Sequence, residues 1–356
     1  MKPVGGRGWC FPYAGGVTPA EFSRAVICSV RGAVEDGELS VTVPERVVVR
    51  VPGGDSRSAD GGVDFACGVA MQMAKQAGRS PLEVAGMLRK RLVGVPGVAR
   101  VDIAGAGFLN VTWTGGARAG LVRSVLAQGP AYGNAGGRGR VEFRAAVEGA
   151  GVRAAVTAEA LEKILPAGGV ATKPGGETVR TREVVEAWPL LVARLGADEA
   201  RWVLLHTAQG DAVRLPDRPV QRESNARFRV QYAYARTCAM TRNARELGFD
   251  AEPADIREVG ETEAQGQALR ELFAAIAEYP ATIEAAARHR APDRVARHLE
   301  VTADAWLRCH DVCPPLPVGE EKPSAVHRGR LALAEAAGTV LANGLHLLGI
   351  STPDRL

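Results

Sequence analysis

The stretch SNARFRVQYAYARTCAMTRNARELG, residues 224–248, carries the clearest helical pattern of the chain. Its polar side chains recur at spacings of 4, 3, 4 and 7 residues, which places them on one face of a helix. That face consists of Asn225, Arg229, Tyr232, Arg236 and Asn243. A neighbouring and mostly apolar face consists of Ala226, Val230, Ala233, Thr237 and Ala244. We therefore predict a helix over 221–247 that packs along one side only.

Further helical segments flank this stretch throughout the C-terminal half. Their apolar residues recur with helical spacing, and Gly, Pro or polar residues separate them. We expect helices over 182–195, 197–208, 262–279, 281–288, 292–313 and 324–348. This pattern predicts an all-α helical bundle.

The N-terminal part mixes helix and strand signals. Thr18, Pro19 and Glu21 form the capping box of a helix start. The other expected elements are a helix over 64–77 closed by Gly78, a helix opened by Ser80-Pro81, and extended segments over 41–51, 98–103 and 108–113. The sequence thus predicts an α+β N-terminal domain followed by an all-α C-terminal bundle.

Four segments follow from these patterns. We expect a flexible tail over 1–16, an α+β domain over 17–115, a linker over 116–175 with helical segments at 115–126 and 158–165, and the helical bundle over 176–356. Sixty residues of linker are too few for a Rossmann domain, because one βαβ unit alone takes about 30. The predicted fold class therefore includes no Rossmann domain.

Composition limits the classes of protein to consider. A hydrophobic content of 46% with 24% charged residues indicates a globular chain with its own core. The longest uncharged stretch near the end, 336–353, is interrupted by glycines and polar residues, so we expect no membrane span. Six scattered cysteines and an N-terminus without an apolar leader segment favour the cytoplasm.

Positive charge gathers around the helix over 221–247. Residues 214–245 contain eight arginines and two acidic residues, although the whole chain carries only +4. A face of Arg, Tyr and Asn suits nucleic acid, because guanidinium groups neutralise phosphates and a tyrosine ring stacks on an unpaired base. The alternative is an ordinary solvated helix face anchored by a tyrosine.

The sequence predicts neither a metal site nor a cofactor. Cys309 and Cys313, with His310 between them, have no second pair to complete the four ligands of zinc. We expect core thiols there. Glycine-rich stretches such as 129–139 lack the strand–GxxxxGK–helix context of a phosphate-binding loop.

Several stretches resemble arginyl-tRNA synthetases. RFRVQYAYAR (227–236) resembles the VQYAHAR signature, with Tyr234 where that family has histidine, and GADEARWVLL (196–205) resembles its DALR region. The last 27 residues and the stretches VDFACGVAMQMAKQAGRSP (63–81) and GAGFLNVTW (105–113) are similar to the two ends of the same family. The resemblance implies tRNA as partner, with Asn225, Arg229, Tyr232, Arg236 and Leu356 at the anticodon loop.

The resemblance is weakest in the middle of the chain. The family's HIGH signature needs two histidines, and the first histidine here is His206. VEFRAA (141–146) looks like the strand before HIGH, and VATK (170–173) keeps only Lys173 of KMSK. We therefore expect no catalytic residues, no amino-acid activation and a truncated paralogue that lacks the catalytic domain, a pseudoenzyme.

The N-terminal domain of that family contacts the tRNA elbow. Its motif, close to Gly-Asp-Tyr-Ala-Thr-Asn, corresponds to Val63-Asp64-Phe65-Ala66-Cys67-Gly68. Asp64 and Phe65 are thus the expected elbow-binding residues, while Gly68 has no side chain to contact a base. The alternative is that Asp64 caps the following helix and Phe65 packs in the core.

The sequence therefore predicts a tRNA-binding protein that no longer aminoacylates and that recognises an arginine-type tRNA. Two alternatives remain open. The chain could present tRNA to a tRNA-dependent enzyme as a non-catalytic subunit, or it could be a regulatory scaffold that no longer binds tRNA. The oligomeric state is unknown at this stage.

Overall fold

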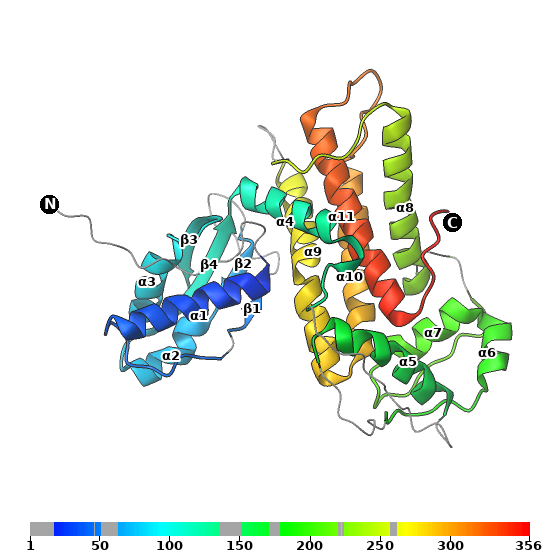
Figure 1. Cartoon of the computed structure of the whole chain (residues 1–356), viewed down its shortest axis with the longest axis horizontal. Coiled ribbons are helices and arrows are strands. Elements are labelled where there is room, and N and C mark those ends of the chain that lie inside the picture. The colour runs from blue at the N-terminus through cyan, green and yellow to red at the C-terminus, as the bar shows by residue number, and fades with distance from the viewer. Residues whose placement is uncertain are drawn as a thin grey trace.

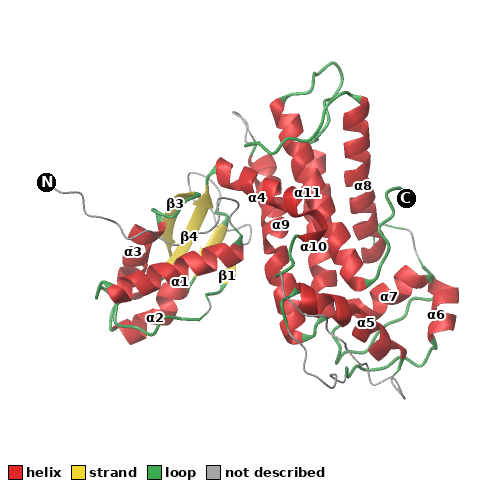
Figure 2. Cartoon of the chain, in the orientation of Figure 1, coloured by secondary structure: helices red, strands yellow, loops and turns green. Residues whose placement is uncertain are grey.

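The computed structural model describes residues 18–45, 47–50, 63–135, 151–170, 179–219, 222, 224–256 and 262–356. Figure 1 shows a smaller unit that contains the sheet beside a larger unit built of helices, and Figure 2 shows that the strands lie in the smaller unit. The expected tail over 1–16, the VEFRAA segment and Lys173 lie outside the described residues.

The smaller unit is a four-stranded antiparallel sheet covered by three helices. The strand order is β1-β2-β4-β3, with β2 paired to β4 through Phe65 opposite Val111. The helices α1, α2 and α3 pack against the sheet. The elements are α1 (Pro19–Glu35), β1 (Val49–Arg50), β2 (Phe65–Cys67), α2 (Val69–Ala77), α3 (Pro81–Leu92), β3 (Val98–Ala104) and β4 (Phe108–Trp113).

Capping boxes start two of these helices, and the sequence predicts the first of them. The Thr18 hydroxyl accepts from the Glu21 amide at 3.2 Å, and the Glu21 carboxylate accepts from the Thr18 amide at 2.7 Å. Ser80 and Glu83 repeat the arrangement at the start of α3. Each box satisfies amides that the first turn of a helix leaves without an intrahelical partner.

The predicted helix over 64–77 is wrong in its first turn. Residues Phe65–Cys67 form β2, and α2 begins only at Val69. Phe65 and Cys67 point into the core while Ala66 is half-buried between them, which is the alternation of a strand. Pairing with β4 decides the conformation of these three residues, and a helical apolar pattern alone could not anticipate it.

The larger unit consists of helices packed around α11. α11 contacts α4, α5, α8, α9 and α10. α11 is long and apolar enough to cross a membrane, but 72% of that window is buried among its neighbours. The helices are α4 (Gly115–Gln128), a 3-10 turn (Gly129–Ala131), α5 (Val152–Ala167), α6 (Trp188–Leu195), α7 (Ala197–His206), α8 (Ala226–Glu246), α9 (Glu263–His289), α10 (Pro292–Val312) and α11 (Ala325–Leu348).

One continuous helix replaces two that the sequence predicts. The expected break at Pro280 does not occur, and α9 runs through it. A proline has no amide, so it leaves the carbonyl four residues earlier, that of Ile276, without its usual donor. The hydroxyl of Tyr132 donates to this carbonyl at 2.9 Å. A side chain 144 residues away thus satisfies the group that the proline leaves unpaired.

The middle of the chain is packed into the helical unit. α4 lies against α11, and α5 contacts α9, α7 and α11. Leu161, Ile164 and Leu165 of α5 are fully buried. The predicted short helix over 158–165 is therefore part of a longer helix, α5, that is buried along most of its length.

Arg153, near the start of α5, is also completely buried. Its guanidinium donates to six backbone carbonyls, and the carboxylate of Glu183 accepts from the amides of Arg153 and Ala154. One acceptor is the carbonyl of Arg182, so this segment is held against α5. The helix predicted over 182–195 accordingly begins only at Trp188.

Candidate nucleic-acid interface

Three partly exposed side chains form a row along α8. Phe228, Tyr232 and Arg236 follow each other at intervals of four residues and are all half-buried. The rings of Phe228 and Tyr232 are stacked, with centroids 6.2 Å apart and planes inclined by 17°. The sequence argument identified Tyr232 and Arg236 but missed Phe228, although its spacing from Tyr232 was the available signal.

Most of the other arginines on α8 have a carboxylate partner. Arg229 pairs with Asp304 of α10 at 2.7 Å, and Arg242 approaches Asp354 at 3.6 Å. Within the part of the chain that the structure describes, no acidic side chain pairs with Arg236. The guanidinium of Arg236 is therefore available to pair with an anion outside the described protein.

The charge of Arg236 also acts on α10. His310 is half-buried there, and its pKa is lowered first by burial and second by the nearby Arg236. Both effects favour the uncharged imidazole. No positive charge on His310 adds to that of Arg236 near neutral pH.

Asn225 serves as the cap of α8. Its carbonyl oxygen accepts from the Phe228 amide at 3.0 Å, and its amide donates to the Glu199 carboxylate at 2.9 Å. Arg227 also donates to Glu199, at 2.6 Å, and both of these charged side chains are buried. Both ends of the Asn225 side chain are thus engaged inside the protein.

A polar network ties α8 to α7 and to the C-terminal segment. Gln231 donates to the Asp198 carboxylate at 2.9 Å and to the carbonyl of Ser351 at 3.0 Å. The amide of Ser351 in turn donates to Asp198 at 3.1 Å. The segment that leads to Leu356 is held in this way beside the start of α8, and Leu356 itself is 58% exposed.

Tyr234 lies between the exposed row and the core. It is half-buried and packs against buried apolar residues. Burial raises the pKa of its hydroxyl to about 12, with a further contribution from Cys238. Tyr234 is therefore a neutral, structural side chain near neutral pH.

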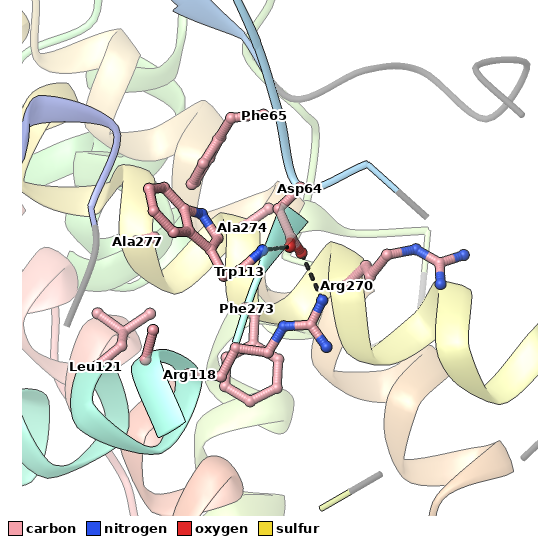
Figure 3. Close-up of a pocket in the computed structure, with 10 residues that line it drawn as sticks. Asp64, Phe65, Trp113, Arg118, Leu121, Arg270, Phe273, Ala274 and Ala277 are labelled. Atoms are coloured by element: carbon pink, nitrogen blue, oxygen red, sulfur yellow. Dashed lines mark hydrogen bonds and ion pairs between the residues drawn. The ribbon is translucent and has the colours of Figure 1, made fainter. Parts of the chain in front are cut away.

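The two expected elbow residues point into the protein. Asp64 is buried and accepts from the Trp113 amide and from the Arg118 guanidinium, both at 2.7 Å (Figure 3). Phe65 is 2% exposed and meets the Trp113 ring edge-on at 6.0 Å. Phe65 thus packs in the core, whereas Asp64 does not cap α2, whose N-cap is Gly68.

Asp64 instead belongs to the junction between the two units. Arg118 of α4 bridges it to α9, because its guanidinium lies over the ring of Phe273 at 5.8 Å. Figure 3 shows Asp64 and Phe273 on opposite sides of Arg118. An ion pair and a cation–π contact therefore link the sheet unit to the helical unit through one side chain.

The buried thiols fit the core interpretation of the sequence. Cys309 and Cys313 are 3% and 1% exposed. No group of three metal-ligating side chains occurs among the described residues.

Comparisons with known proteins match both ends of the chain to one family. Residues 230–356 match the DALR anticodon binding domain, and residues 45–113 match the arginyl tRNA synthetase N terminal domain. The DALR anticodon-binding domain expected from the sequence is thereby confirmed for 230–356. The residues of the α8 row and of the C-terminal segment lie largely within this match.

Three bacterial relatives are arginine–tRNA ligases. That of Frankia alni is 26% identical over 570 aligned positions, which cover 96% of this chain and 100% of the relative. This chain has 356 residues, so at least 214 of those positions are gaps in it. The proteins of Paenarthrobacter aurescens and Renibacterium salmoninarum are 39% and 37% identical over 47% and 52% of this chain, and over 30% and 32% of their own length.

Two solved structures share the fold. The arginyl-tRNA synthetase of Thermus thermophilus matches with a TM-score of 0.58 at 13% identity, over 96% of this chain and 100% of that one. The arginyl-tRNA synthetase of Plasmodium falciparum matches with a TM-score of 0.62 at 7% identity, over 97% and 100%. At these identities the comparison concerns the fold alone.

These matches correct the expected fold class. The sequence predicts an α+β domain plus an all-α bundle with no Rossmann catalytic domain, a fold different from that of complete synthetases. This prediction is contradicted, because both structural matches span the whole of the synthetase chain. The sequence argument treated 116–175 as a linker with a remnant of the catalytic domain. In the structure, α4 and α5 of that segment pack against α11 and α9.

The expected truncated paralogue and pseudoenzyme is contradicted as well. The interpretation "not an enzyme, no amino-acid activation" rested on the HIGH and KMSK signatures and on the short length of 116–175. The match to the Frankia alni arginine–tRNA ligase, in contrast, runs along the full length of that protein. The similarity is therefore not confined to the two ends. In sequence and in fold, this chain is similar along its length to arginine–tRNA ligases.

Proposed function

We propose that the chain binds an arginine-accepting tRNA through the row Phe228–Tyr232–Arg236 on α8, and that this tRNA is a substrate of arginine–tRNA ligation. The observation that carries the binding proposal is the row itself. Two stacked rings offer a platform for an unpaired base, and the guanidinium one turn further can neutralise a phosphate. Ligation is supported by the full-length match to an arginine–tRNA ligase.

The surroundings of the row favour a preformed site. Asn225 caps the helix, and the Gln231–Asp198–Ser351 network fixes α8 against α7 and the C-terminal segment. Binding then requires little further loss of side-chain conformational entropy. Leu356 stands exposed at the end of that segment and is a further contact in this proposal.

For the N-terminal unit we propose a contact with the tRNA elbow through its shape and backbone. The side chains of Asp64 and Phe65 are buried, so their contribution is to position the unit. A cytoplasmic location goes with the proposal, because the buried thiols Cys67, Cys309 and Cys313 suit a reducing compartment.

The binding test uses Tyr232→Ala and Arg236→Ala with an arginine-accepting tRNA at several salt concentrations. Loss of the stacked ring should cost about 1–3 kcal/mol of binding free energy. Loss of Arg236 should weaken binding and reduce the salt dependence by about one phosphate. Melting temperatures show whether each variant stays folded. Unchanged affinity of both folded variants would refute the proposed binding site.

The ligation test is separate. The purified chain is incubated with ATP, labelled arginine and the same tRNA, and charged tRNA is measured. We expect charging that depends on all three substrates and falls in Tyr232→Ala through weaker tRNA binding. Charging no greater than without protein would remove ligation from the proposal and leave the binding result intact.

A further inference from the structure

A basic groove lies next to the row on α8 and is not part of it. It lies between α7 and residues of 207–218, 222 and 224–226, has a volume of about 630 Å³, and its lining includes Ala226, the first residue of α8. Its lining includes Arg214, Arg218 and Arg222. All three arginines are exposed, and none has an ion pair with another described residue.

The acidic residue in the lining does not compensate these charges. Glu199 is the one carboxylate there, and it already accepts from Arg227 and Asn225. Among the lining residues of α7, the Trp202 ring stacks on His206, whose Nε2 lies 3.3 Å from the Glu300 carboxylate. The lining of the groove therefore carries three guanidinium groups that no described carboxylate pairs with.

Two arginines of other helices anchor the segment that carries Arg214 and Arg218. The buried Arg153 donates to the carbonyls of Thr207, at 2.8 Å, and Asp211, at 2.7 Å. Further along, Arg194 of α6 donates to the carbonyl of Pro216.

Between and beside these anchors, inward and outward side chains alternate. Val213 and Leu215 pack against the core, so Arg214 between them is turned to solvent. Arg218 follows Pro216 by two residues and is exposed as well. The two guanidinium groups are thus carried on a fixed segment and face an open groove.

We propose that this groove binds the sugar–phosphate backbone of the RNA strand whose bases contact the row on α8, with Arg214 and Arg218 each neutralising one phosphate. The proposal rests on the function proposed above. RNA backbone is the favoured occupant because the groove is open, is lined by three arginines and includes Ala226 at the start of α8, two residues before Phe228. Fixed cationic grooves of this kind hold single strands without reading their sequence.

The test measures the affinity of an RNA hairpin with the anticodon stem and loop of an arginine-accepting tRNA between about 50 and about 200 mM salt. For single-stranded contacts the salt slope falls by about 0.7 per phosphate. The double variant Arg214→Gln with Arg218→Gln should thus lose about 1.4 from the slope. Its affinity relative to wild type should change about sevenfold over this fourfold salt range.

Two further double variants serve as controls. Arg214→Lys with Arg218→Lys keeps both charges and should keep the wild-type slope. Arg288→Gln with Arg308→Gln removes the same charge from α9 and α10, where both arginines pair with glutamates, and should leave the slope unchanged. A wild-type slope in Arg214→Gln with Arg218→Gln would overturn the groove proposal. An equal loss of slope in Arg288→Gln with Arg308→Gln would overturn it too.

The outcomes separate this proposal from the one it rests on. Tyr232→Ala should weaken hairpin binding equally at all salt concentrations, because a neutral ring releases no counterions. If the wild type binds and only the groove variants behave as wild type, the groove fails and the α8 row stands. If the wild type shows no binding to the hairpin, both proposals fail.

Discussion

Arg153→Met is the substitution for which the structure predicts the sharpest local effect. The guanidinium is fully buried and donates to six carbonyls over distances of 2.7 to 3.3 Å. Burial lowers the pKa of Arg153, which reflects the cost of placing its charge inside the protein. Methionine keeps much of the side-chain length and removes every donor. The six acceptors are the carbonyls of Arg182, Leu204, Thr207, Ala208, Gln209 and Asp211.

The magnitude follows from what those carbonyls can do afterwards. A hydrogen bond to a charged group contributes about 1.5–3 kcal/mol. The contributions of the six hydrogen bonds do not simply add. Water can reach the carbonyl of the exposed residue Asp211, and the substitution also removes the cost of burying the charged guanidinium. We expect a loss of about 3–5 kcal/mol, the range for breaking a buried charged network. It should be concentrated in residues 179–213.

Hydrogen exchange with peptide resolution measures this loss where it occurs. A chain with two packed units need not unfold in one transition, so a melting temperature alone is insufficient. The amide of Arg182, which donates to Gln209 at 2.9 Å, and that of Asp211, which donates to Ala208 at 2.9 Å, should exchange about a thousandfold faster. Peptides from α11 are the internal reference.

Two variants complete the design. Arg153→Lys keeps the charge but offers three donors in place of five, so its effect should be intermediate. Arg288→Met removes an exposed arginine of α9 and should change nothing in this segment. Exchange in 179–213 that stays within about threefold of wild type in Arg153→Met would refute the assigned role.

Two further predictions concern α9 and α10. Burial lowers the pKa of His298 from 6.5 to about 4, so between these pH values the unfolded chain binds a proton that the folded chain does not. The free energy of unfolding therefore falls as the pH drops through this window, by about 3 kcal/mol in all. His298→Gln should flatten the dependence of melting temperature on pH there, and slopes equal to those of the wild type would contradict this prediction. Gly133 has a φ of +87°, and a Cβ on it would lie 2.5 Å from the ring of Tyr279, so Gly133→Ala should lower stability by about 1–3 kcal/mol. Gly210→Ala, where a Cβ meets nothing within 4 Å, is the control in the same melting experiment.

The elements whose signals are local could be predicted from the sequence. The capping pair Thr18–Glu21 needs only three residues of separation, and the row on α8 follows from a spacing of four. The stretch 224–248 therefore predicted both a long helix and the partly exposed Tyr232 and Arg236. The two ends of the chain also carried enough local similarity to indicate the family that the comparisons later matched.

The tertiary structure decided everything that depends on a partner distant in sequence. Pro280 lies inside a helix because Tyr132 supplies the missing donor, and Phe65 lies in a strand because β4 runs beside it. Asn225 is occupied by Glu199, and Asp64 by Arg118, through contacts that span 26 and 54 residues. The free energy of a buried polar group depends on whether a partner reaches it, and that partner is set by how the chain folds back, which no local spacing records.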